Sequence, residues 1–125
     1  MSEPPDPINE AELSRLWEGQ RFPGEALRTV DGRAVRVVYP GRRGGGPGPD
    51  FRDAVVFVGD EERRGDVELH VRASAFRGHG HNDDAAYDGV ALHVVYLADD
   101  GRETRLRSGK RAPVAALAPW VAGRA

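Results

Sequence analysis

The chain has 125 residues, 39% hydrophobic and 30% charged, which is ordinary for a soluble globular protein of one domain. Its net charge of −2 gives no overall attraction to nucleic acid or anionic membranes, and the lack of cysteine excludes disulfides and thiolate zinc sites. No apolar run approaches the length of a membrane span, and the N-terminus lacks a signal peptide. We therefore expect a cytoplasmic protein without a membrane partner.

The N-terminal segment contains a tail and then a helix. Residues 1–7 include three prolines and are expected to form a flexible tail, whereas residues 8–122 are expected to form a single α+β domain. Asn9 and Glu12 have the spacing of a capping box, which predicts a helix that begins after Asn9. Gly19 is the predicted stop of this helix.

The rest of the chain reads as strands separated by turns. Asp31-Gly32 is a strong two-residue turn signal and predicts a hairpin between 27–30 and 33–39. The Gly/Pro-rich segment 40–49 is predicted to be irregular. Further strands are predicted over 51–58, 66–73, 90–97 and 103–107, with a helical turn near 84–87 and a final helix over 114–121. This order predicts an α+β fold with a mixed β-sheet and flanking helices.

The strand predicted over 66–73 contains the strongest functional signal. Alternation along a strand puts Asp66, Glu68 and His70 on one face and three apolar residues on the other. Ionisable groups inside a strand are costly unless they are solvated, paired or bound to a metal. This cost marks the strand as a candidate site.

The register of the next hairpin decides whether Asp50 reaches these groups. A tight turn at 59–61 places Asp50 opposite His70, whereas a loop over 59–65 leaves Asp50 roughly 20 Å from Glu68 at ~3.3 Å per residue. We favour the tight turn because three-residue turns with glycine are common. This register also pairs Val58 with Glu62 and Arg52 with Glu68, and puts Phe51, Val55 and Phe57 on the apolar face.

Two interpretations of these groups stay open. Asp50 and Glu68, with the carbonyl of Leu69 and water, would form an oxygen-rich site for Mg²⁺ or Mn²⁺. His70 could then orient or deprotonate an attacking water. The alternative is an ion-pair ladder in which Arg52 neutralises Glu68 and His70 bonds to Asp50.

The remaining histidines are secondary candidates. His79 and His81, with Asp83 nearby, could ligate a transition metal, although glycine-rich loops usually leave histidines in water. His93, inside a predicted strand, is either a structural histidine or faces Asp50. A zinc site built from His70, His79, His81 and His93 is therefore a further hypothesis, less favoured than Mg²⁺ or Mn²⁺.

Several short motifs together resemble a known pattern. They are Thr29-Val30-Asp31-Gly32, Pro40-Gly41, Gly48-Pro49-Asp50-Phe51, Val67-Glu68-Leu69-His70, His79-Gly80-His81, Ala86-Tyr87-Asp88 and Val90 to Val95. The pattern is similar to that of a bacterial family catalogued as a domain of unknown function, whose typically longer members resemble this chain in their N-terminal part. Gly44, Ala75 and Phe76 depart from it, at positions where the family tends to have asparagine, aspartate and tryptophan.

The pattern also resembles, more remotely, the PD-(D/E)xK nuclease superfamily. Pro49-Asp50 and Glu68-Leu69-His70 occupy the places of its two motifs, with His70 where lysine is usual. The resemblance implies a restriction-endonuclease-like αβββαβ core, a magnesium ion bound by Asp50 and Glu68, and a water positioned by His70.

These observations lead to two hypotheses about function. The first is a metal-dependent, nuclease-like phosphodiesterase that acts on nucleic acid, with Asp50, Glu68 and His70 as catalytic residues. Arg42, Arg43 and Arg52 are then the candidates for substrate binding, since arginine and exposed amides suit a phosphate backbone. The second is a catalytically inactive module of the same fold that binds nucleic acid or a protein.

Overall fold

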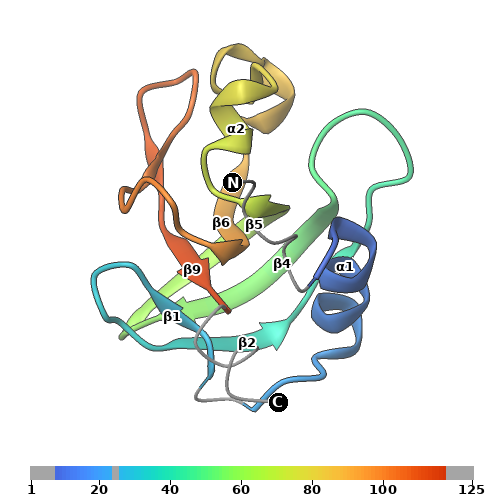
Figure 1. Cartoon of the computed structure of the whole chain (residues 1–125), viewed down its shortest axis with the longest axis vertical. Helices are drawn as coiled ribbons and strands as arrows, with labels where there is room; N and C mark the ends of the chain where they lie inside the picture. Colours follow the sequence, from blue (N-terminus) through green and yellow to red (C-terminus); the bar gives the residue numbers. More distant parts are fainter. Residues whose placement is uncertain (1–7, 24–25, 118–125) are drawn as a thin grey trace, which may run out of the picture.

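The computed structural model describes residues 8–23 and 26–117, which form an α+β structure around a mixed, curled sheet (Figure 1). The predicted tail and the last residues of the predicted domain lie outside the described ranges. The sheet has the strand order β1-β9-β6-β5-β4-β2, and β3 pairs with β4 at one end. In chain order the elements are α1 (Glu10–Gly19), β1 (Arg28–Thr29), β2 (Val35–Tyr39), β3 (Arg42–Arg43), β4 (Phe51–Val58), β5 (Glu61–Arg72), α2 (Ala75–Gly78), η2 (His81–Asp83), η3 (Ala85–Tyr87), β6 (Val90–Leu97), β7 (Thr104–Arg105), β8 (Arg111–Ala112) and β9 (Val114–Ala116).

The helix α1 begins where the capping residues predict. The side chain of Asn9 accepts a hydrogen bond of 2.9 Å from the backbone N–H of Glu12, which satisfies one of the free donors at the helix start. At the other end Gln20 adopts the left-handed conformation, with φ of 50°, one residue after Gly19. The fully buried Leu13 and Trp17 join the core cluster that contains apolar residues of β5, so α1 covers one face of the sheet.

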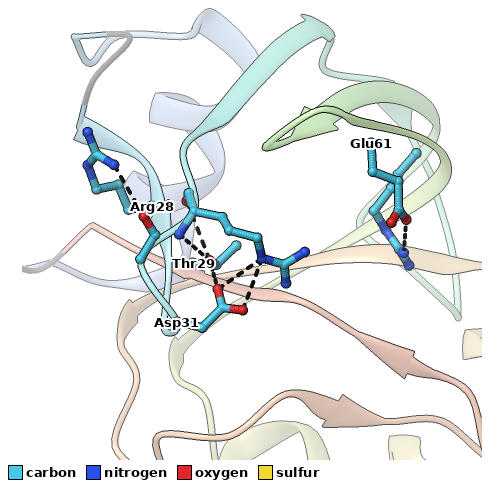
Figure 2. Close-up of polar contacts among 7 residues, drawn as sticks. Arg28, Thr29, Asp31 and Glu61 are labelled. Carbon is cyan, nitrogen blue, oxygen red and sulfur yellow. Dashed lines mark hydrogen bonds and ion pairs between the residues drawn. The ribbon is translucent and has the colours of Figure 1, made fainter.

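The turn at Asp31-Gly32 is also confirmed (Figure 2). The Asp31 carboxylate accepts hydrogen bonds from the Thr29 hydroxyl and from the Arg33 guanidinium, and Thr29 accepts another from the Arg33 backbone N–H at 2.9 Å. The two arms then diverge: β1 pairs with β9, and β2 pairs with β4. A single bridge between Arg28 and Ala34 joins them directly.

The hairpin of β4 and β5 has a tighter register than predicted. Val58 pairs with Glu61 instead of Glu62, because the turn consists of two residues, the first of which is Gly59 with φ of 58°. Closer to Asp50 the register shifts again at a β-bulge, where Asp53 has φ of 60°.

This bulge reverses the expected faces of β4. Phe51 is buried as predicted, but Val55 and Phe57 are only partly buried. The extra residue at the bulge turns the following part of the strand over, since side chains alternate with a period of two. The residues that join Phe51 in the core are Ala54, Val56 and Val58.

The strand β6, predicted over 90–97, is buried along most of its length. The chain passes from β5 to β6 through α2, η2 and η3, the crossover at the top of Figure 1. The strand β6 pairs in parallel with both β5 and β9. The predicted helix over 114–121 is wrong in its described part, because Val114–Ala116 fill the sheet position between β6 and β1. Pairing on both sides outweighs the helix propensity of alanine here. The predicted strand over 103–107 is reduced to β7, which forms a separate two-stranded sheet with β8.

The other face of the sheet, opposite α1, is covered by the crossover and this small sheet. A second apolar cluster joins them, and its members are Phe76, Tyr87, Val90, Leu106 and Ala112. Within the described residues no helix is long and apolar enough to cross a membrane.

Candidate metal centre

Asp50 and Glu68 lie in direct contact. The backbone N–H of Asp50 donates to Glu68 Oε1 at 3.2 Å, and Asp50 Oδ2 accepts a hydrogen bond of 2.8 Å from the backbone N–H of Leu69. The two side chains also share a hydrogen bond. Asp50 therefore faces Glu68, and not His70 as the predicted register implied, because Phe51 pairs with Val67. The structure nevertheless brings the two carboxyl groups together on the strand face opposite the buried Val67 and Leu69.

The middle of the glycine-rich loop over 40–49 lies close to the end of the loop and holds Asp50 in place. The backbone N–H of Gly44 donates to the carbonyl of Asp50 at 2.9 Å. A Cβ atom on residue 44 would lie 2.4 Å from the carbonyl oxygen of Pro49, too close for any side chain without a shift of the backbone. Glycine at this position, where the family pattern has asparagine, thus suits the path of this loop.

Three histidines complete the site. His70 Nε2 lies 3.4 Å and His81 Nε2 3.3 Å from Glu68 Oε2. His79 also belongs to the group, since one nitrogen from each of the three rings lies within 4.8 Å of the others. This group could hold a metal ion.

The crossover places the two loop histidines against β5. His79 follows α2 directly and His81 begins η2, with Gly80 between them in the left-handed conformation at φ of 75°. The ring of His81 stacks on Tyr87 with 3.9 Å between centroids, and Tyr87 is itself buried in the second apolar cluster. Packing against an aromatic ring thus holds a histidine that the sequence suggested would be in water.

His93 supports the site without facing it. Its Nε2 lies 2.9 Å from His70 Nδ1, and its Nδ1 lies 2.7 Å from the Thr104 hydroxyl. Both ring nitrogens are therefore engaged, and His93 is absent from the histidine group that could hold a metal. Thr104 has no signal in the sequence, because only the folding of β7 over β6 brings it to His93.

Burial controls the protonation of the site. The pKa of Glu68 is raised to about 10, first by burial and then by its hydrogen bond and repulsion with Asp50. The pKa of His70 is lowered to about 3, first by burial and then by the neighbouring His81 and His79. Burial likewise lowers the pKa of His81. Without a metal, the centre therefore combines a protonated Glu68 with neutral imidazoles of His70 and His81 at neutral pH.

The predicted ion-pair ladder does not form. Arg52 lies 3.7 Å from Asp66, not beside Glu68, and His70 bonds to His93, not to Asp50. The carboxyl group of Glu68 instead lies beside the rings of His70 and His81.

The other predicted residues lie around this centre. Asp83 is exposed and is not part of the histidine group. Arg42 pairs with Asp53, whereas Arg43 bonds to Glu18 at 2.7 Å and to Ser14 at 3.1 Å. The candidate substrate-binding arginines therefore contact acidic or polar side chains in the absence of substrate.

The donor set bears on the identity of the metal. Imidazole suits zinc and other transition metals, whereas carboxylate and water suit magnesium and manganese. A histidine-rich site beside Glu68 fits zinc as well as the expected Mg²⁺ or Mn²⁺.

Comparisons with known proteins give a family but no activity. No curated protein and no solved structure is significantly similar to this chain. A family model described as "Protein of unknown function (DUF2851)" matches residues 10–124, which include every residue of the candidate metal centre. The match spans nearly the whole chain, and the chain belongs to this family.

Proposed function

We propose that the protein is a metal-dependent phosphodiesterase that acts on nucleic acid, with a metal held by Glu68 and the histidine group beside Asp50. The observation that carries the proposal is the contact between Asp50, which is exposed, and Glu68, which is buried and only 3% exposed. The buried carboxyl group of Glu68 must retain a proton or bind a cation, because burial disfavours its charged form and the neighbouring Asp50 raises its pKa further. The adjacent neutral imidazoles are metal ligands in that state.

The chain's own groups are positioned for such chemistry. A divalent ion bound here would polarise a phosphodiester and lower the pKa of a water molecule. The Leu69 N–H fixes the Asp50 carboxylate, and the Asp50 N–H fixes that of Glu68, so the backbone orients both groups before a ligand binds. Burial of Glu68 excludes bulk water from the same place and strengthens the electrostatic interactions there.

The order of elements is compatible with the nuclease fold that the resemblance implies. When β1 and β3 are left out, the series α1, β2, β4, β5, α2, β6 is similar to the helix, three strands, helix and strand of that core. Asp50 immediately precedes β4, and Glu68 and His70 lie in β5, as in the superfamily motifs. In this proposal Arg42, Arg43 and Arg52 exchange their present partners for substrate phosphates.

The test is cleavage by the purified, untagged protein after removal of metal with EDTA. Single- and double-stranded DNA and RNA would be incubated with Mn²⁺, Mg²⁺ or Zn²⁺ in turn. We expect Asp50→Asn and Glu68→Gln each to abolish cleavage, whereas Asp83→Asn, which alters an exposed carboxylate outside the centre, keeps it. Equal cleavage by wild type, Asp50→Asn and Glu68→Gln would disprove the proposal.

One observation favours the inactive binding module as a second candidate. His70 stands where the superfamily has lysine, yet its Nδ1 is bonded to His93 and its lowered pKa keeps it neutral. The centre then lacks the positive charge that a lysine would bring. Salt-dependent binding of nucleic acid without cleavage in any of the three metals would support the module.

A further inference from the structure

A cavity of about 470 Å³ lies between α2, η2 and the small sheet of β7 and β8. This volume is within the range of sites for small molecules. Four arginines and two acidic residues contribute to its lining, which leaves an excess of positive charge. They are Arg77, Arg102, Arg105, Arg111, Asp100 and Glu103.

Two of these arginines are placed against each other by the strand register. Arg105 in β7 and Arg111 in β8 are directly paired, so their Cβ atoms are about 5 Å apart and their side chains share a face. Both side chains are exposed, and like charges in such a pair destabilise a sheet, so an anion bound between them would relieve the repulsion. In the described part of the chain, neither guanidinium forms an ion pair with an acidic side chain, and the same holds for Arg77 and Arg102.

The two acidic residues do not neutralise this group by direct contact. Asp100 accepts a hydrogen bond of 3.3 Å from the backbone N–H of Arg102, not from its guanidinium. Glu103 contributes, after Asp31, to raising the pKa of Arg33 on the turn between β1 and β2. Within the described residues, it forms no ion pair with the arginines of the cavity. The lining thus presents planar guanidinium groups, each with several hydrogen-bond donors.

We propose that this cavity is a second ligand site that binds a phosphate group. Guanidinium groups bind phosphate oxygens in pairs and remain charged at every physiological pH. The volume of about 470 Å³ leaves room for more than a phosphate ion, so we assign the phosphate to a free mononucleotide or to the end of a nucleic-acid strand. Both sources present the same chemistry to Arg105 and Arg111.

The site is separate from the metal centre. Phe76 lines the cavity, and its ring lies against the histidines, with centroids 5.4 Å from His81 and 5.2 Å from His93. Thr104 also lines the cavity and bonds to His93 through its hydroxyl. The lining of the cavity includes none of Asp50, Glu68, His70, His79 and His81. Phosphate binding therefore requires no metal, and this inference stands whether or not the centre cleaves phosphodiesters.

The test measures binding of phosphate to the whole chain in EDTA, by isothermal titration calorimetry. Inorganic phosphate is the first probe, and the double variant Arg105→Gln/Arg111→Gln is compared with wild type. We expect phosphate binding to be at least about tenfold weaker in this variant, because charge-assisted hydrogen bonds are lost. The control Arg15→Gln/Arg64→Gln removes the same number of charges from α1 and β5, away from the cavity, and should bind phosphate as wild type does.

Further probes identify the source of the phosphate. A mononucleotide is compared with oligonucleotides that carry a 5′-phosphate or a 5′-hydroxyl group. Preference for the mononucleotide assigns a free nucleotide, and preference for the phosphorylated oligonucleotide assigns a strand end. Equal phosphate affinity in wild type and Arg105→Gln/Arg111→Gln would overturn the site, as would binding that disappears in EDTA. Far-ultraviolet circular dichroism verifies that the variants are folded.

Discussion

His70 is the residue through which the centre is connected to the rest of the molecule. Its Nε2 faces Glu68 at 3.4 Å, and its Nδ1 lies 2.9 Å from His93. If Nε2 binds a metal, Nδ1 must carry the proton and donate it to His93 Nε2, and His93 Nδ1 then donates to Thr104. Such outer contacts orient a metal-binding imidazole and increase its basicity. His93 thereby has a positioning role in the proposed site.

Replacement of His93 should affect both stability and metal affinity. In His93→Ala, the buried Nδ1 of His70 loses its partner and a cavity opens, so we expect a loss of about 2–4 kcal/mol in unfolding free energy. Zinc affinity should fall about 10- to 100-fold. Urea denaturation in EDTA and competition with a chromophoric zinc chelator measure the two quantities.

His79→Ala is the matched comparison for this prediction. His79 is exposed, so its removal should change the unfolding free energy by no more than about 0.5 kcal/mol while it weakens zinc binding. A His93→Ala protein with the stability and zinc affinity of wild type would show that the contact with His70 has no positioning role.

At the scale of the element, the bulge in β4 determines which side chains reach the core and which reach the site. Asp53 in the left-handed region lets Phe51 and Ala54 both face α1, although three positions separate them. The same irregularity brings Asp50 opposite Glu68. Core and centre therefore depend on one residue conformation.

Substitution of Asp53 tests this dependence. A β-branched residue is strained at φ of 60°, so Asp53→Val should lower the unfolding free energy by about 1–2 kcal/mol. Asp53→Gly removes the same exposed ion pair with Arg42 but fits the conformation, so its stability should stay within about 1 kcal/mol of wild type. Urea denaturation of both variants measures the difference. Equal loss in both would assign the effect to the ion pair instead.

The sequence predicts local features of this structure well. The cap at Asn9 and the turn at Asp31-Gly32 follow from short-range patterns. These features depend on residues within one turn, one helix end or one hairpin, where spacing determines geometry.

Features that depend on distant parts of the chain escape such reasoning. No local signal marks the bulge at Asp53, whose reversal of β4 appears only when the strand pairs with β5. His81 was expected in water, but Tyr87 fixes it beside Glu68. The local sequence over 114–116 predicts a helix, but the segment forms a strand because it pairs with β6 on one side and β1 on the other.

At the scale of the whole molecule, the two faces of the sheet differ in chemistry. The face under α1 is an apolar core, whereas the face under the crossover contains Glu68 and buried histidines, with the arginine-lined cavity beyond Phe76. The favourable free energy of apolar burial on the first face must offset the unfavourable free energy of polar burial on the second. That cost depends on pH, because each buried group is held in its neutral form.

The metal-free protein should therefore have its highest stability near the ordinary pKa of histidine. Below pH 6.5 the unfolded chain protonates His70 and His93, whose pKa values in the folded state are lowered to about 3, so stability decreases as the pH falls. Above that pH, Glu68 keeps its proton in the folded state, with its pKa of about 10, but ionises in the unfolded chain near 4.5. Stability should then decrease with rising pH, by at most about 1.4 kcal/mol per pH unit.

Urea denaturation in EDTA from about pH 5 to about pH 9 measures this profile. Glu68→Gln cannot ionise and should remove the alkaline decrease while the acidic one remains, since that belongs to the histidines. Zinc or manganese should reverse the alkaline decrease in wild type, because metal binding requires the ionised carboxylate and strengthens as the pH rises. If metal-free wild type instead became more stable between about pH 7 and about pH 9, or had the slope of Glu68→Gln there, Glu68 would be ionised in the folded state. The buried carboxyl group of Glu68 could then no longer be the reason why the site needs a cation.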